Sequence, residues 1–126
     1  TVKYLGETSN VLPYIEKATC HVLPSYREGV TRVLLEAASM ERPIIASNVP
    51  GCREIVIDNY NGFLCEAQDT NSLIACMMHM LSLAPTELTS FGKNGRSHVL
   101  QQFDEQKTIA LYKHKLQEYF LTEEHE

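Results

Sequence analysis

The chain has 126 residues, of which 44% are hydrophobic, and a formal net charge of −5. This length allows one globular domain at most, and the hydrophobic content is enough for a core, so a disordered chain is excluded. The acidic balance disfavours general binding to nucleic acid or to an anionic membrane surface. No apolar run in the sequence approaches the roughly 20 residues that a transmembrane helix requires.

Four short apolar runs in the first half of the chain have the composition of strands. The predicted strands are Val2–Leu5, Cys20–Leu23, Ile44–Ala46 and Phe63–Cys65. Helix-forming segments alternate with these runs, and such alternation is typical of parallel strands joined by crossover helices. The sequence therefore predicts an α/β fold with a Rossmann-like parallel sheet, flanking helices and a helical C-terminus.

The predicted helices carry apolar residues three or four positions apart, which indicates one buried face on each. They span residues 11–17, 31–40, 69–83 and 86–102, and a last helix begins at residue 105; residues 52–57 form a short helix or an extended segment. We expect Asn10 to cap the first helix and Gly51 to supply a positive φ in a turn. The expected buried face of the helix at 69–83 consists of Leu73, Ile74, Met77 and Leu81. The expected buried face of the last helix consists of Ile109, Tyr112, Leu116 and Phe120.

A polar loop joins the second predicted strand to the helix that begins at Thr31 or Arg32. Glu28 lies in this loop and Glu36 lies inside the helix. In open α/β sheets, ligands bind beyond the carboxyl ends of strands, where helix N-termini offer free N–H groups to phosphates. Carboxylates suit the diols of sugars because they offer several acceptor sites and no donor. The sequence thus predicts a binding site here, although both glutamates could instead be surface acids paired with Arg27 and Arg32.

Three longer strings carry a resemblance to a known family. They are PSYREGVTRVLLEAA at 24–38, RPIIASNVPGCREIV at 42–56 and NGFLC at 61–65. In this order they resemble the C-terminal, donor-binding domain of retaining GT-B glycosyltransferases of family 4 (group 1), over nearly the whole chain. PSYREG together with PGCREIV looks most like bacterial transferases that build capsular or lipid-linked oligosaccharides.

The resemblance implies a role for each matching residue. In the family, the first glutamate of the motif contacts the donor sugar and the second contacts the nucleotide ribose, so Glu28 is the expected catalytic residue and Glu36 the expected ribose ligand. Family members often carry glycine or a small residue where this chain has Thr31, so the approach of the backbone to the sugar differs there. The expected donor sugar and phosphate contacts are Ser25, Glu28, Gly29, Val30, Thr31 and Arg32.

The resemblance also implies a reaction and a domain organisation. The reaction is transfer of a hexosyl or N-acetylhexosaminyl group from a nucleotide diphosphate sugar, with UDP as the expected nucleotide, to a saccharide or lipid-linked saccharide. We expect residues 1–126 to be one domain of a larger enzyme, with an α/β part at 1–66 and C-terminal helices at 67–126. The start at Thr1 without methionine agrees with this expectation. The acceptor is then held by an N-terminal domain across a cleft.

No metal or cofactor is expected, because the sequence has no Asp-x-Asp pair to hold a cation on a diphosphate. Nucleic acid is not an expected partner. The four cysteines are widely spaced and form no C-x-x-C pair, which indicates reduced thiols and a cytoplasmic protein. The resemblance is also compatible with peripheral association of the full enzyme with the inner face of the bacterial plasma membrane.

The alternative to a glycosyltransferase domain is a non-catalytic flavodoxin-like regulatory or protein-binding module with two exposed glutamates.

Overall fold

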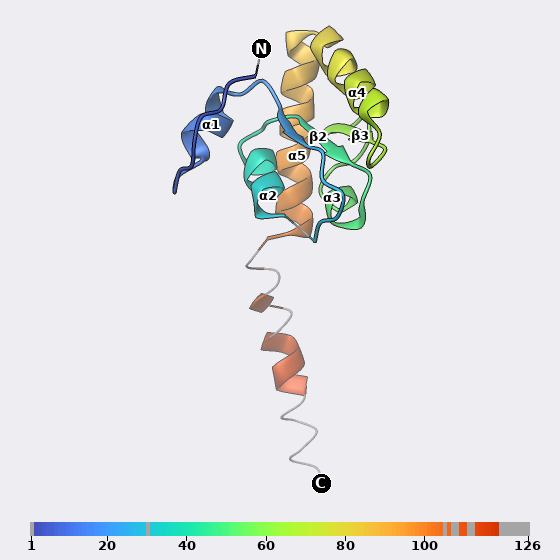
Figure 1. The fold of residues 1–126 in the computed structure, drawn as a ribbon. Helices are drawn as coiled ribbons and strands as arrows, with labels where there is room; N and C mark the ends of the chain where they lie inside the picture. Colours follow the sequence, from blue (N-terminus) through green and yellow to red (C-terminus); the bar gives the residue numbers. More distant parts are fainter. Residues whose placement is uncertain (1, 30, 105, 107–108, 111–112, 119–126) are drawn as a thin grey trace.

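The computed structural model describes residues 2–29, 31–104, 106, 109–110 and 113–118. In this part of the chain, three parallel strands form a sheet with helices on both faces (Figure 1). The elements are α1 (Leu12–Lys17), β1 (His21–Leu23), α2 (Arg32–Ser39), β2 (Ile44–Ser47), α3 (Pro50–Arg53), β3 (Gly62–Cys65), α4 (Thr70–Ser82) and α5 (Pro85–Gln102). Residues 113–118 are also helical. The predicted α/β class with a parallel sheet is confirmed.

The central strand of the sheet is β2, which pairs with β1 on one side and with β3 on the other. All four of its residues are buried, as expected for a strand covered on both faces. Gly62 of β3 lies opposite Ile44, and a Cβ atom at Gly62 would stand 1.8 Å from the Ile44 carbonyl oxygen. Only glycine therefore allows the two strands to approach this closely.

The two faces of the sheet pack against different helices. Side chains of α2, α3 and the end of α5 cover one face, whereas α4 and the start of α5 cover the other. The first cluster is centred on Leu34, Ala37, Ala38, Ile44, Ala46, Cys52, Ile55, Val56 and Val99, and the second on Ile45, Phe63 and Met80. Alternate residues of β2 thus point to opposite helical layers, as strand geometry requires.

The predicted strand Val2–Leu5 is wrong. These residues have no regular secondary structure, and the side chains of Val2 and Tyr4 are 99% and 84% exposed. A strand needs a neighbour that satisfies its backbone N–H and C=O groups, and the described sheet ends at β1 without pairing to this segment. Local apolar composition was therefore not sufficient for strand formation.

The predicted buried face of α4 is also wrong in part. Met80 is 3% exposed, and Leu73 and Cys76 pack beside it against the second cluster. In contrast, Ile74, Met77 and Leu81 are 51%, 42% and 77% exposed. The helix is apolar over more than one face, so the contact with Phe63 and α5 selected a stripe that periodicity alone did not identify.

Capping side chains set the starts of several helices. The prediction of Asn10 as the N-cap of α1 is wrong by one residue, because the N-cap is Val11 and its side chain makes no capping bond; the Asn10 Oδ1 atom still accepts a hydrogen bond from the Leu12 N–H at 3.2 Å. Asp69 Oδ1 accepts from the Ser72 N–H at 3.0 Å and starts α4. These bonds satisfy N–H groups that have no partner within the helix.

The last predicted helix falls only partly within the described residues. Ile109 and Leu116 are 45% and 55% exposed, whereas Tyr112 and Phe120 lie outside the described residues. Among the helices that the structure describes, none combines the length and the apolar character needed to cross a bilayer.

Candidate functional site

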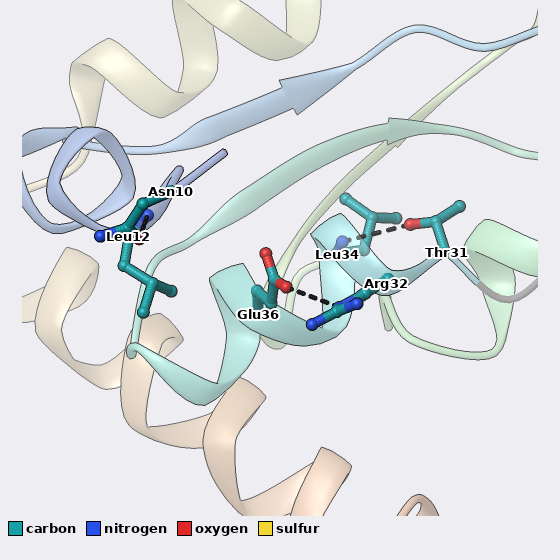
Figure 2. A network of polar contacts seen from close by, with 6 residues as sticks. All are labelled: Asn10, Leu12, Thr31, Arg32, Leu34 and Glu36. Atoms are coloured by element: carbon teal, nitrogen blue, oxygen red, sulfur yellow. Dashed lines mark hydrogen bonds and ion pairs between the residues drawn. The ribbon is translucent and has the colours of Figure 1, made fainter. Parts of the chain in front are cut away.

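The polar loop predicted from the sequence leaves β1 at the carboxyl edge of the sheet and leads into α2. Thr31 is the residue before the helix; its backbone is extended, and its Oγ1 atom accepts a hydrogen bond from the Leu34 N–H at 3.1 Å (Figure 2). This side chain uses one of the free N–H groups at the helix start and leaves those before Leu34 without an intrahelical acceptor. The predicted strand, loop and helix arrangement is confirmed.

Glu28 is held inside the loop by a neighbouring hydroxyl. The Ser25 Oγ atom donates a hydrogen bond to the Glu28 Oε1 atom at 2.7 Å, and the Glu28 residue is half-buried. A short hydrogen bond to a carboxylate is stronger than one between neutral groups. The loop therefore presents Glu28 in a fixed orientation, with its other carboxylate oxygen not used in this bond.

Helix α3 supports the same loop from the side. The Gly51 N–H donates to the Glu28 carbonyl oxygen at 3.2 Å. A Cβ atom at Gly51 would stand 2.1 Å from the Gly29 carbonyl oxygen and 2.4 Å from that of Glu28. The prediction of a positive φ at Gly51 is wrong, because the residue is helical and glycine is required by this close approach.

The thiol of Cys52 lies close enough to this loop to sense the charge of Glu28. Burial raises the pKa of the Cys52 thiol, and the Glu28 carboxylate raises this pKa further. Burial likewise raises the pKa values of Cys20 and Cys76, and all four cysteines of the chain are free. The thiols of Cys20, Cys52 and Cys76 are therefore neutral near pH 7 and pack as small apolar groups.

Glu36 has a different partner from Glu28. The Arg32 Nε atom donates to the Glu36 Oε1 atom at 3.0 Å, within α2 (Figure 2). The side chains of Arg32 and Glu36 are 93% and 25% exposed. A helical ion pair of this kind contributes only about 0.3–0.5 kcal/mol, so a ligand can replace the Arg32 contact at low cost.

The structure thus divides the predicted site residues into two pairs. Ser25 and Glu28 lie together in the loop, and Arg32 and Glu36 lie together on α2. Gly29 is exposed and has open space where a side chain would stand, and Val30 lies outside the described residues. The ligand roles of these residues stay predictions.

Sequence reasoning missed the part that α3 takes in building the loop. Gly51 and Cys52 contact or influence Glu28 across more than twenty positions of sequence. The Pro50–Gly51 pair signalled a turn, but nothing local to it indicated contact with residues 28–29. Within the described part of the chain, no group of three or more His, Cys, Asp and Glu side chains is placed to hold a metal ion.

A parallel sheet with a polar loop and a helix start at its carboxyl edge is the arrangement at which open α/β domains bind ligands. The family model described as glycosyl transferases group 1 matches residues 1–83. The chain belongs to this family.

Individual relatives agree with the family match. An uncharacterized glycosyltransferase of Methanocaldococcus jannaschii is 34% identical over 97 residues, which cover 75% of this chain and 27% of the relative. An Escherichia coli enzyme named UDP-Gal:alpha-D-GlcNAc-diphosphoundecaprenol alpha-1,3-galactosyltransferase is 34% identical over 101 residues, covering 79% of this chain and 26% of that enzyme. The chain therefore spans about a quarter of the length of these relatives.

A solved structure supports the same fold. Sucrose-phosphate synthase from Thermosynechococcus elongatus superposes with a TM-score of 0.76 at 33% sequence identity. The match covers 89% of this chain and 28% of that chain. Both the sequence and the fold thus identify this chain as a domain of a group 1 glycosyltransferase.

Proposed function

We propose that the chain is the donor-binding domain of a retaining, metal-independent GT-B glycosyltransferase of family 4. The donor is a nucleotide diphosphate sugar, with UDP as the nucleotide, and a hexosyl or N-acetylhexosaminyl group is transferred. The acceptor is a saccharide or a lipid-linked saccharide, as in the E. coli relative whose name includes a diphosphoundecaprenol acceptor. The proposed setting is polysaccharide synthesis on the cytoplasmic side of a bacterial membrane.

One observation carries this proposal: two carboxylates flank the start of α2 at the carboxyl edge of a parallel sheet. Glu28 is oriented by Ser25 in the loop, and Glu36 stands one helical turn beyond Arg32. Ligands of open α/β sheets bind at this edge, and a helix start favours phosphate. Membership in the family disfavours the alternative of a non-catalytic flavodoxin-like module.

In the proposed mechanism, the start of α2 stabilises the diphosphate leaving group. The N–H groups of Thr31 and Arg32 precede the first intrahelical hydrogen bonds and are free for phosphate oxygens. Each donor of this kind stabilises a transition state by about 3 kcal/mol. The same role is proposed for the N–H of Val30, and no protein-bound metal is required in this scheme.

Glu28 and Glu36 have separate roles in the proposal. Glu28 accepts hydrogen bonds from hydroxyls of the donor sugar next to the reacting carbon. Glu36 exchanges its ion pair with Arg32 for two hydrogen bonds from the ribose diol, which leaves the Arg32 guanidinium free to contact a phosphate. The ribose contact contributes to nucleotide affinity, and the sugar contact contributes to donor selection.

We also propose that residues 1–126 act within a larger enzyme. The relatives are three to four times as long as the segment that matches them. The acceptor and the groups that activate it are assigned to a second domain across a cleft from the Ser25–Glu36 segment. The 126-residue chain is then expected to bind donor without turning it over.

A titration tests the assigned roles. UDP and UDP-glucose are added to the ¹⁵N-labelled chain while backbone amide shifts are recorded, and Glu36→Gln and Glu28→Gln are compared with the unaltered protein. Glu36→Gln is expected to weaken UDP binding about tenfold or more, as for loss of hydrogen bonds to a charged group. Glu28→Gln is expected to weaken only UDP-glucose, because free UDP lacks the sugar.

Glu16→Gln is the matched control, because Glu16 is an exposed carboxylate on a different helix, α1, and has no predicted role in donor binding. It should leave both affinities unchanged. Equal affinities for all three variants and the unaltered chain, or shifts outside residues 25–36, would show that the assignment of the donor site is wrong.

A further inference from the structure

A polar cavity lies at the amino edge of the sheet, on the side opposite the candidate donor loop. Its volume is about 380 Å³, and it is bounded by the residues that lead into β1, by those that lead into β2 and by the start of α5. Its polar lining residues are Lys17, Thr19, Glu41, Arg42 and Thr89. None of the residues predicted to bind the donor lines it, so the cavity is separate from the candidate donor site.

Arg42 is the most informative residue of this cavity. Among the side chains that the structure describes, its Nε atom is the one buried nitrogen or oxygen without a hydrogen-bond partner. Buried polar atoms normally have a partner, because removal from water without one costs free energy. No ion pair joins the Arg42 guanidinium to another described residue either. An anion in the cavity would supply the missing counter-charge.

The neighbouring carboxylate does not neutralise Arg42. Glu41 lines the same cavity, but among the described residues it forms an ion pair with neither Arg42 nor Lys17. The lining thus carries two cations and one carboxylate, whereas the whole chain has a net charge of −5. This local excess of positive charge attracts anions to a surface that is otherwise mostly acidic.

The turn that carries Arg42 is fixed against α5. The Arg96 Nη1 atom of α5 donates a hydrogen bond to the Ser39 carbonyl oxygen at 3.0 Å. A Cβ atom at Gly92 would stand 2.1 Å from the Glu41 carbonyl oxygen, so the helix lies directly against the turn. The backbone at Arg42 is therefore in place before a ligand arrives, which lowers the entropy cost of binding.

The chemistry of the lining favours one ligand class. A guanidinium group offers paired N–H donors that match two oxygens of a phosphate, and an ammonium group adds a compact charge. The Thr19 hydroxyl and the Glu41 carboxylate can bond further polar groups of a ligand. Ligand pockets have about 300–1,000 Å³, so this cavity lies near the lower limit and suits phosphate or a small organic phosphate, not a nucleotide sugar.

We propose that this cavity binds a phosphate group, of free phosphate or of a small organic phosphate, through Arg42 and Lys17. The Arg42 guanidinium donates to two phosphate oxygens, and the Lys17 ammonium group donates to a third. The inference does not depend on the proposed glycosyltransferase function. Within such an enzyme the bound anion acts away from the reacting atoms, because the length of the sheet separates it from the loop that contains Glu28.

The test uses inorganic phosphate. Sodium phosphate is titrated into the ¹⁵N-labelled chain at constant ionic strength, with sodium chloride as the replaced salt. Phosphate should shift the amides of residues 17–19 and 41–42 and saturate in the millimolar range. Arg42→Gln should weaken this binding about tenfold or more, and Lys17→Gln about fivefold, as for the loss of charge-assisted hydrogen bonds. Arg42→Lys should weaken it about threefold, because the charge is kept and the planar fork is lost.

Lys113→Gln is the matched control, because Lys113 is exposed and does not line the cavity. It should leave the affinity for phosphate unchanged. Without phosphate, Arg42→Gln should unfold at the same urea concentration as the unaltered chain or at a higher one, because an unpaired charge is removed. Phosphate should then stabilise the unaltered chain and Lys113→Gln more than Arg42→Gln.

A second arm separates the two sources of the phosphate group. Glucose 6-phosphate replaces inorganic phosphate, and glucose serves as the reference without phosphate. Binding of glucose 6-phosphate that is fivefold tighter or more identifies an organic phosphate as the ligand, whereas equal or weaker binding identifies free phosphate. Both results support the phosphate site.

Two results would overturn the inference. One is that phosphate leaves the amides of residues 17–19 and 41–42 unmoved; shifts confined to residues 31–36 would then support the donor site alone. The other is that Arg42→Gln and Lys17→Gln bind phosphate as tightly as the unaltered chain. In contrast, phosphate shifts at 17–19 and 41–42 in a chain that does not bind UDP would support this site and contradict the donor assignment.

Discussion

Residues 2–17 and residues 21–39 have the same order of an apolar run, a loop and a helix, but they differ in packing. In the first region Val2, Tyr4 and Leu5 are 99%, 84% and 59% exposed, and Ile15 is the buried residue of α1. In the second region β1 pairs with β2, and α2 buries Leu34, Ala37 and Ala38. The first region lacks a paired strand within the described sheet.

This difference shows that strand pairing, not local apolar content, decides which segment joins the core. A strand gains stability when neighbours satisfy its backbone groups and cover its faces. Three substitutions test this dependence on packing, at the sheet, at the loop of the second region and in the first region, and they are ordered from the largest expected effect to the smallest.

Gly62→Ala should cause the largest loss of stability, about 3 kcal/mol, because overpacking against rigid backbone is costly. The added methyl group would stand 1.8 Å from the Ile44 carbonyl oxygen, so β2 and β3 would have to separate. Urea unfolding followed by circular dichroism measures the change.

Gly95→Ala is the control for this substitution. Its methyl group would meet Asn61 Cβ at 3.4 Å, and the position lies inside α5. Stability should stay level or rise by up to about 1 kcal/mol, because alanine favours a helix over glycine. Similar losses for both variants would show that the spacing of β2 and β3 is not the cause.

Gly51→Ala should destabilise the protein by about 1–2 kcal/mol, since a loop moves more easily than a paired strand. The methyl group would stand 2.1 Å from the Gly29 carbonyl oxygen and displace the loop that carries Glu28. Amide shifts should change at residues 24–29 in the absence of ligand. Gly29→Ala, which has open space at the new methyl group, should change stability by less than about 0.5 kcal/mol. Equal unfolding midpoints for the two variants would contradict the proposed contact.

Tyr4→Ser should have the smallest effect, within about 0.5 kcal/mol, because the Tyr4 side chain is 84% exposed. The same urea unfolding experiment applies. A loss above about 2 kcal/mol would mean that residues 2–5 pack against the folded domain, and the contrast between the two regions would then be incorrect.

Much of the local structure could be predicted because its causes lie within a few residues. Thr31 caps α2 through Leu34, and Asp69 caps α4 through Ser72. The apolar run of β2 is short and free of charge, as a strand buried on both faces requires. The candidate site could be located for the same reason, since the loop containing Glu28 and the helix containing Glu36 follow one another directly.

The sequence by itself determined the α/β class, the helix starts and the position of the polar loop, through periodicity and capping that act over one or two turns. Only the tertiary structure decided that residues 2–5 stay unpaired, that Met80 and not Leu81 faces the sheet, and that Gly51 supports the Glu28 loop. Each of these features depends on contacts between residues distant in the chain, and no local pattern specifies which surfaces will meet.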